Sequence, residues 1–260
     1  MSETTHQISS IIPVPPYPQR IISLVPSITE LLFDLGLEDR VAGITKFCVH
    51  PEHWFRMKTR VGGTKNIKID TIQSIAPDLI IANKEENVKE QIELLASGFP
   101  VWVTDINNFE EALEMIIQTG QITGKKERAC QLSQQIQMAF TALPVLTKKI
   151  RTVYLIWKDP WMTVGGDTFI QDMMNKAGLL NVFGEAKRYP VINLEKIEEA
   201  RPELVLLSSE PYPFKQKDFD QLQSLLPDTR ILAADGEIFS WYGSRLLKAP
   251  AYFQELRSLY

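Results

Sequence analysis

The sequence has little of what builds disulfide frameworks, membrane spans or nucleic-acid surfaces. Its only cysteines, Cys48 and Cys130, show no framework spacing, so we expect free thiols. No window approaches the roughly 18 uninterrupted apolar residues that a membrane-spanning helix needs. Lysine and arginine form no block and the net charge is −4, which argues against a nucleic-acid partner. The apolar fraction of 44% and the charged fraction of 23% are those of an ordinary folded, soluble protein.

Catalytic signatures are also missing. The chain contains no G-x-S-x-G elbow, no H-E-x-x-H pair and no G-x-G-x-x-G loop. The segment "GQITGKKE" fails as a phosphate-binding loop, because its glycines are one residue too close and Lys125 is followed by another lysine. We therefore expect a binding protein and not an enzyme.

The segment 1–19 does not read as an export signal. It has an acidic residue where a signal peptide has basic ones, and it lacks an apolar core, a small-residue cleavage site and a cysteine that could carry a lipid. As written, the chain is not expected to be exported, and its location stays open.

The remainder alternates strand and helix patterns in two halves. "RIISLVPS" predicts a strand, and "SITELLFDLG" predicts a helix with Ser27 as N-cap and Glu30 completing a capping box. This alternation predicts an α/β fold with parallel sheets and helices on both faces. We expect an N-terminal tail (1–19), an N-terminal lobe (20–123), one long connecting helix (124–147) and a C-terminal lobe (148–260).

Two segments repeat the same local order. "GGTKNIKIDTIQSIAPDLIIA" and "GEAKRYPVINLEKIEEARPELVLLS" each contain a glycine loop, an acidic residue opening a helix, and a helix that exits through proline and an acid into a strand. Asp70 and Glu195 are the paired helix-opening acids. The match favours two related Rossmann-like lobes over a single sheet, with a ligand cleft between them.

The order of several motifs carries a family resemblance. "PQRIISLVPSITELLFDLG", "VGGTKN", "IAPDLIIAN", "GGDTFIQDMMNKAGLLNVF" and "DGEIFSWYGSR" together resemble the substrate-binding proteins of ABC importers for cobalamin and iron chelates. The resemblance runs from Pro18 to the C-terminus. It implies two lobes flanking a long helix, a metal chelate such as cobalamin, haem or a ferric siderophore as ligand, no resident cofactor, and a monomer that delivers its ligand to a membrane permease. A cytoplasmic metal-handling protein or enzyme on the same fold is the alternative.

Aromatic side chains gather in loops at the predicted strand ends. Rigid aromatic faces suit a large flat ligand, although an aromatic residue at a strand end more often packs into the core. The resemblance implies aromatic ligand contacts and one acid, and two positions depart from the cobalamin binders, with a threonine for tryptophan in the "GGTKN" loop and a tryptophan for arginine in the last loop. The expected ligand-binding residues are Phe47, Thr64, Lys65, Trp161, Tyr189, Glu237, Trp241 and Tyr242.

Two other features have a simpler explanation. Cys48, His50 and His53 lie in the loop "CVHPEHW", but three residues of one short loop converge poorly on one metal, so we expect no metal site. Gly165 and Gly166 could offer amide groups to an anion, although a tight turn with Asp167 or Thr168 as N-cap is the better prediction.

Asp70 and Glu195 also admit two roles. A carboxylate in the first helical turn favours the helix dipole. The resemblance implies that these acids dock to a two-fold permease, one acid per lobe.

Overall fold

The computed structural model describes residues 12–259, which form two compact units. Unit 1 comprises residues up to Ile106, together with Glu110–Gln137 and Tyr242–Arg245. Unit 2 comprises Asn107–Phe109, Met138–Trp241 and the residues from Leu246 onward. Within residues 12–259, no helix is long and apolar enough to cross a membrane.

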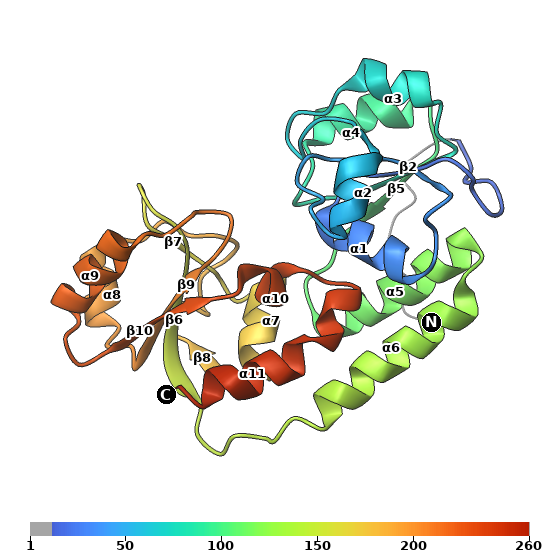
Figure 1. Cartoon of the computed structure of the whole chain (residues 1–260). Helices are drawn as coiled ribbons and strands as arrows, with labels where there is room; N and C mark the ends of the chain where they lie inside the picture. The colour runs from blue at the N-terminus through green and yellow to red at the C-terminus, as the bar shows by residue number, and fades with distance from the viewer. Residues whose placement is uncertain (1–11, 260) are drawn as a thin grey trace. The chain divides into compact units, whose positions relative to one another are not determined.

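Unit 1 is built on a five-stranded parallel sheet in the order β3-β2-β1-β4-β5. Its elements are β1 (Ile21–Ser23), α1 (Pro26–Asp34), β2 (Val41–Ile44), α2 (Glu52–Met57), β3 (Thr59–Arg60), α3 (Ile69–Ile75), β4 (Leu79–Asn83), α4 (Lys89–Ala96), β5 (Val101–Thr104) and α5 (Phe109–Thr123). Ile22 and Ile80 of the sheet pack with Ile72 of α3 and Leu95 of α4 in one buried cluster. Figure 1 shows α1 and α5 on the other side of this sheet.

Unit 2 has a second five-stranded sheet, in the order β10-β9-β6-β7 with β8 also paired to β6. Its elements are β6 (Ile150–Trp157), β7 (Met162–Thr163), α7 (Phe169–Lys176), β8 (Leu179–Asn181), α8 (Leu194–Glu199), β9 (Leu204–Ser208), α9 (Gln216–Leu225), β10 (Arg230–Ala234), α10 (Gly236–Ser240), the 3₁₀ helix η1 (Ser244–Leu247) and α11 (Ala249–Arg257). Val153 and Leu155 of β6 face Ile197 of α8 and Leu222 of α9. Tyr154, between them in the strand, contacts Phe239 of α10.

The repeat seen in the sequence is present in the two sheets. In each unit a central strand, β1 or β6, is flanked by the strand that follows the repeated helix, β4 or β9. Ile21 pairs with Leu79 in unit 1, and Thr152 pairs with Leu204 in unit 2. The two-lobed α/β prediction is confirmed, except that the second sheet is mixed, because β7 runs antiparallel to β6.

Two helix predictions are corrected. The helix expected at Ser27 begins at Pro26, because proline supplies the backbone angle of a first helical residue, and Val25 is the N-cap. The helix expected over 124–147 is α6 (Lys126–Thr141). Gly124 has a φ of 71° and separates α6 from α5, and unit 1 takes in α6 as far as Gln137.

Candidate functional site

Phe47 lies in the loop that follows β2, with half of its side chain exposed (50%). Lys46 places its ammonium group 5.0 Å from the ring centroid. The ring lies against Gly63, where an added Cβ would sit 3.2 Å from Cε2 of Phe47. Because Gly63 has no side chain, the glycine loop leaves the Phe47 ring accessible to solvent.

Thr64 and Lys65 are held in the same loop region by polar side chains of the next crossover. Asn87 donates from its amide to the Thr64 carbonyl over 3.1 Å, and Gln91 donates to the Lys65 carbonyl over 3.2 Å. Lys65 in turn donates from its ammonium group to the carbonyl of Glu85. The structure thus gathers Phe47, Thr64 and Lys65 in unit 1, and it adds Asn87, which the sequence analysis missed.

Trp161 is a core residue of unit 2. Only 8% of it is exposed, and its ring stacks on Phe214 with an interplanar angle of 13° and centroids 6.1 Å apart. Phe214 contacts Tyr212, which contacts Trp157, and Trp157 is 39% exposed. Trp161 is thus largely packed into unit 2, and Trp157 is the more exposed ring of this aromatic group.

Tyr189 follows a loop that is fixed by the two glycines. Gly165 donates to the carbonyl of Arg188 over 2.7 Å, and Gly166 donates to the carbonyl of Ala186 over 2.8 Å. Both amide groups are thereby occupied, so the anion hypothesis for this pair is wrong. Thr168 is the N-cap of α7 as predicted, accepting from the amide of Gln171 over 3.2 Å.

Glu237 lies in α10 and Trp241 is the C-cap of this helix, beside a partly buried acid, Glu210, which the sequence analysis missed. Glu210 accepts from the Trp241 indole over 2.9 Å and from the Ser240 hydroxyl over 2.8 Å. Burial raises the pKa of Glu210, and the nearby charges of Glu237 and Asp235 act in the same direction. Trp241 itself is only 7% exposed. Tyr242 is also buried and belongs to unit 1.

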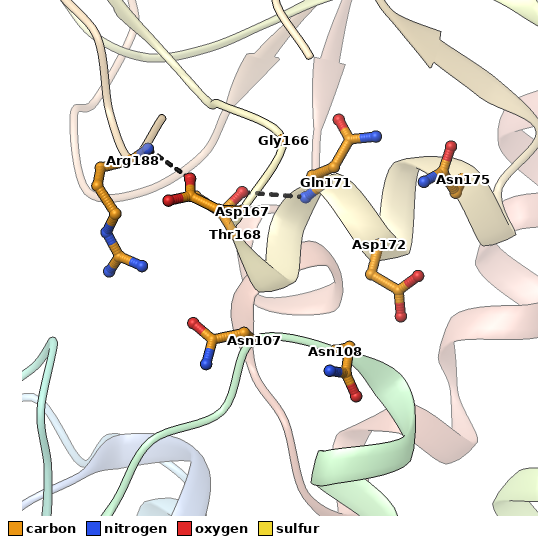
Figure 2. Close-up of a pocket in the computed structure, with 9 residues that line it drawn as sticks. All are labelled: Asn107, Asn108, Gly166, Asp167, Thr168, Gln171, Asp172, Asn175 and Arg188. Atoms are coloured by element: carbon orange, nitrogen blue, oxygen red, sulfur yellow. Dashed lines mark hydrogen bonds between the residues drawn. The ribbon is translucent and has the colours of Figure 1, made fainter. Parts of the chain in front are cut away.

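A polar pocket of about 410 Å³ lies at the start of α7 (Figure 2). Figure 2 shows Asp172 projecting from the helix toward Asn108, and Arg188 beside Asp167. The Arg188 amide donates to Oδ1 of Asp167, and Asp172 accepts from the Phe109 amide over 2.8 Å. All of its lining residues belong to unit 2: Asn107, Asn108, Gly166, Asp167, Thr168, Gln171, Asp172, Asn175 and Arg188.

Comparison with known proteins assigns this architecture to a family. A family model described as periplasmic binding protein matches residues 21–234. The chain belongs to the periplasmic binding protein family. It is 27% identical over 195 residues to the vitamin B12-binding protein of Vibrio parahaemolyticus, which covers 73% of this chain and 70% of that protein.

Solved structures of periplasmic binding proteins share the fold. The periplasmic vitamin B12-binding protein BtuF of Vibrio cholerae has a TM-score of 0.73 at 20% identity, covering 94% of this chain and 99% of that one. The periplasmic heme-binding protein HutB of Vibrio cholerae has a TM-score of 0.77 at 21% identity, covering 93% and 98%. Family membership confirms the predicted class, a solute-binding protein and not an enzyme.

In this periplasmic binding protein, Asp70 and Glu195 occupy the same position of equivalent helices. Each is exposed and is the second residue of its helix, α3 in unit 1 and α8 in unit 2. Within the described part of the chain neither carboxylate accepts a hydrogen bond from its own helix end, and the N-cap of α8 is Asn193, which accepts from the Lys196 amide over 3.0 Å. The two acids are thus presented to solvent, one by each unit.

Cys48, His50 and His53 meet different surroundings. The Cys48 thiol is buried between the hydroxyl groups of Thr29 and Thr45, at 3.1 and 3.2 Å, and burial raises its pKa. His53 is exposed and lies 3.3 Å from a carboxylate oxygen of Glu38. Among the described residues there is no group of three or more histidine, cysteine, aspartate or glutamate side chains that could hold a metal.

Proposed function

We propose that this protein is the substrate-binding component of an ABC importer, and that its cargo is a planar metal chelate of the size of a corrinoid or haem. Substrate-binding proteins of this family bind small molecules and work with ABC permeases. Relatives named for vitamin B12 and for heme support this size class. No resident cofactor is proposed, because the metal belongs to the cargo.

The observation that carries the proposal is the half-exposed Phe47 ring in the loop that follows β2. An open aromatic face buries a large flat ligand at low entropic cost. Unit 2 offers two partly exposed rings, Trp157 at the carboxyl end of β6 and Tyr189 in the loop that follows β8. Since small molecules bind beyond the carboxyl ends of parallel strands, we propose that these loops supply the ligand contacts of each unit.

Two positions set this site apart from the cobalamin binders that it resembles. Thr64 supplies a small side chain in the glycine loop, and Trp241 is tied to Glu210 by its indole group. Glu237 and Lys65 supply charges near the same loops. We therefore propose a corrinoid or haem as the first ligands to test, and a ferric siderophore as the third.

Delivery is proposed to use Asp70 and Glu195. Each acid is exposed on its own unit, at the same position of an equivalent helix. A partner with two-fold symmetry and one basic patch per subunit would match this arrangement. A monomer suffices for such docking, because one copy provides both acids.

Equilibrium titration with cyanocobalamin, haemin and a ferric siderophore tests the proposal, with native mass spectrometry of the protein purified from its own host. We expect saturable one-to-one binding of one of these chelates, and a visible absorbance spectrum for the loaded protein. Absence of binding by all three, together with a colourless and ligand-free native protein, would refute the function.

A further inference from the structure

The pocket at the start of α7 is polar and carries more negative than positive charge. Two carboxylates, Asp167 and Asp172, and one guanidinium group, Arg188, contribute a net charge of −1. The other polar side chains of its lining include four carboxamides, among them Asn107 and Asn108. Such a surface can exchange hydrogen bonds with neutral groups at little electrostatic cost.

The helix end itself does not call for an anionic ligand. The hydroxyl of Thr168 already caps α7, and two acids of the protein, Asp167 and Asp172, already lie at the positive end of the helix dipole. A further carboxylate entering this pocket would meet both of them. A carboxamide, by contrast, both donates and accepts, and so can pair with Asn107, Asn108 and the acids together.

The orientation of Gln171 is fixed by a buried neighbour. Asn181, which is 6% exposed, donates to Oε1 of Gln171 over 2.7 Å and to the Val164 carbonyl. Oε1 is therefore the acceptor, and the amide group of Gln171 is left as a donor on the pocket lining. Among residues 12–259 no hydrogen bond is donated to Oδ2 of Asp167, so donor and acceptor positions occur together in one lining.

We infer that this pocket binds the neutral carboxamide groups at the edge of a corrinoid and discriminates against carboxylates. The inference rests on the proposed function and selects between its ligands. A corrinoid carries peripheral amides, whereas haem carries two propionates that are ionised at neutral pH. The pocket thus makes the amide-bearing chelate the preferred cargo.

The test compares cyanocobalamin with its monocarboxylic acid derivatives, in which one amide is hydrolysed, and with haemin. Affinities are measured by isothermal titration at low salt for the wild type and for Asp167→Asn. The substitution keeps Oδ1 as an acceptor for the Arg188 amide and removes one negative charge. Asp228→Asn is the matched control, because it removes the same charge from an exposed turn of the same unit.

We expect wild-type protein to bind cyanocobalamin more tightly than at least one monocarboxylic acid and more tightly than haemin. Asp167→Asn is expected to reduce the ratio between the affinities for cyanocobalamin and for the monocarboxylic acid by about threefold to tenfold. This is the range for one charge acting near a protein surface. Asp228→Asn should leave this ratio of affinities unchanged. A Gln171→Glu variant, which keeps the bond from Asn181 but loses the donor, should weaken cyanocobalamin binding by about fivefold.

Failure of the pocket assignment can be distinguished from failure of the proposed importer function. Tight cyanocobalamin binding that is matched by every monocarboxylic acid, or an equal response in Asp167→Asn and Asp228→Asn, overturns the pocket assignment and leaves the importer function standing. Preference of the wild type for haemin does the same. Lack of binding to cyanocobalamin, haemin and a ferric siderophore overturns both.

Discussion

Two aromatic residues with the same predicted role have different surroundings in the folded protein. Phe47 and Trp161 both follow strands, and both were expected to contact the ligand. Half of Phe47 is exposed, and its ring edge lies close to Gly63, which has no side chain to cover it. Trp161 is enclosed by Phe214 and by residues of the unit 2 core. Composition and position along the chain cannot separate these two residues, since the burial of a ring depends on which distant residues pack against it in the fold.

Alanine substitution should separate the two residues. Phe47→Ala is expected to weaken ligand binding by about 1–3 kcal/mol, as for exposed aromatic anchors, and to leave the melting temperature unchanged within error. Trp161→Ala is expected to reduce the free energy of unfolding by about 3–5 kcal/mol, as for buried aromatic residues. Isothermal titration and urea denaturation measure the two effects. A stable Trp161→Ala protein with reduced affinity would return Trp161 to the ligand site.

Glu210 predicts an unusual dependence of stability on pH. Its pKa is raised in the folded state, above the ordinary value of 4.5, so the folded protein holds the proton more tightly than the unfolded chain. Ionisation of Glu210 therefore lowers stability as pH rises from about 4.5 through the raised pKa. Gln at this position can still accept from Trp241 and Ser240, and it carries no charge.

Glu210→Gln is accordingly expected to match the wild type in stability at pH 4 and to exceed it at pH 8. Urea denaturation at a series of pH values provides the measurement. The matched change Glu237→Gln removes a neighbouring charge and keeps the Glu210 carboxylate with its hydrogen bonds, so it should give a smaller difference. A variant that loses stability at pH 8 would show that the charge of Glu210 is itself stabilising.

At the scale of elements, the repeat extends to an acidic residue that accepts hydrogen bonds from the start of each central strand. This arrangement is called here the polar brace. Asp78 accepts from the backbone amides of Gln19 and Arg20, both over 2.7 Å. Glu203 accepts from the amide of Arg151 over 3.1 Å and from Lys148 over 2.8 Å. Each acid follows a proline and opens the strand after the repeated helix. The brace therefore ties the helix exit to the neighbouring central strand in both units.

Removing the braces should affect the two units unequally. Asp78→Ala leaves two backbone amides without their charged acceptor and is expected to cost about 1.5–3 kcal/mol of stability. Glu203 is exposed, and its pKa is lowered by the hydrogen bonds from Lys148 and Arg151, so Glu203→Ala should cost less than about 1 kcal/mol. Urea denaturation of each variant, with Asp228→Ala as control, distinguishes them. Equal costs would mean that exposure does not weaken the second brace.

These elements show what could be predicted from the sequence and what could not. The proline and acid that end each repeated segment were visible, and so the related sheets were predicted. The capping box at Ser27 was wrong, because Pro26 starts the helix and Glu30 is used elsewhere. Arg245 donates to both carboxylate oxygens of Glu30, over 2.7 and 3.0 Å. A contact between residues so far apart in the chain leaves no local pattern. Glu210 and Asn87 were missed for the same reason.

For the whole molecule, the positions of the acidic residues bear more on partner docking than the net charge does. Several helices carry an acid in the first turn, including Glu90 of α4 and Glu127 of α6, and such acids generally serve the helix dipole. Asp70 and Glu195 differ in occupying equivalent helices of two related units. Exposed charges of this kind set association rate and salt dependence more than final affinity. Docking is therefore where their role can be measured.

Complex formation with the reconstituted cognate permease should depend on both acids. Asp70→Ala and Glu195→Ala are each expected to slow association, and the double variant is expected to slow it further, because each unit contributes one attractive charge. The differences should shrink at high salt, since screening shortens the reach of exposed charges to about 8 Å at physiological ionic strength. Glu90→Ala is the matched control, an exposed first-turn acid on a helix outside the repeat. Ligand affinity should be unchanged in all four variants. If the double variant associates as fast as the wild type at low salt, or if Glu90→Ala slows association equally, Asp70 and Glu195 are helix-dipole acids and docking uses another surface.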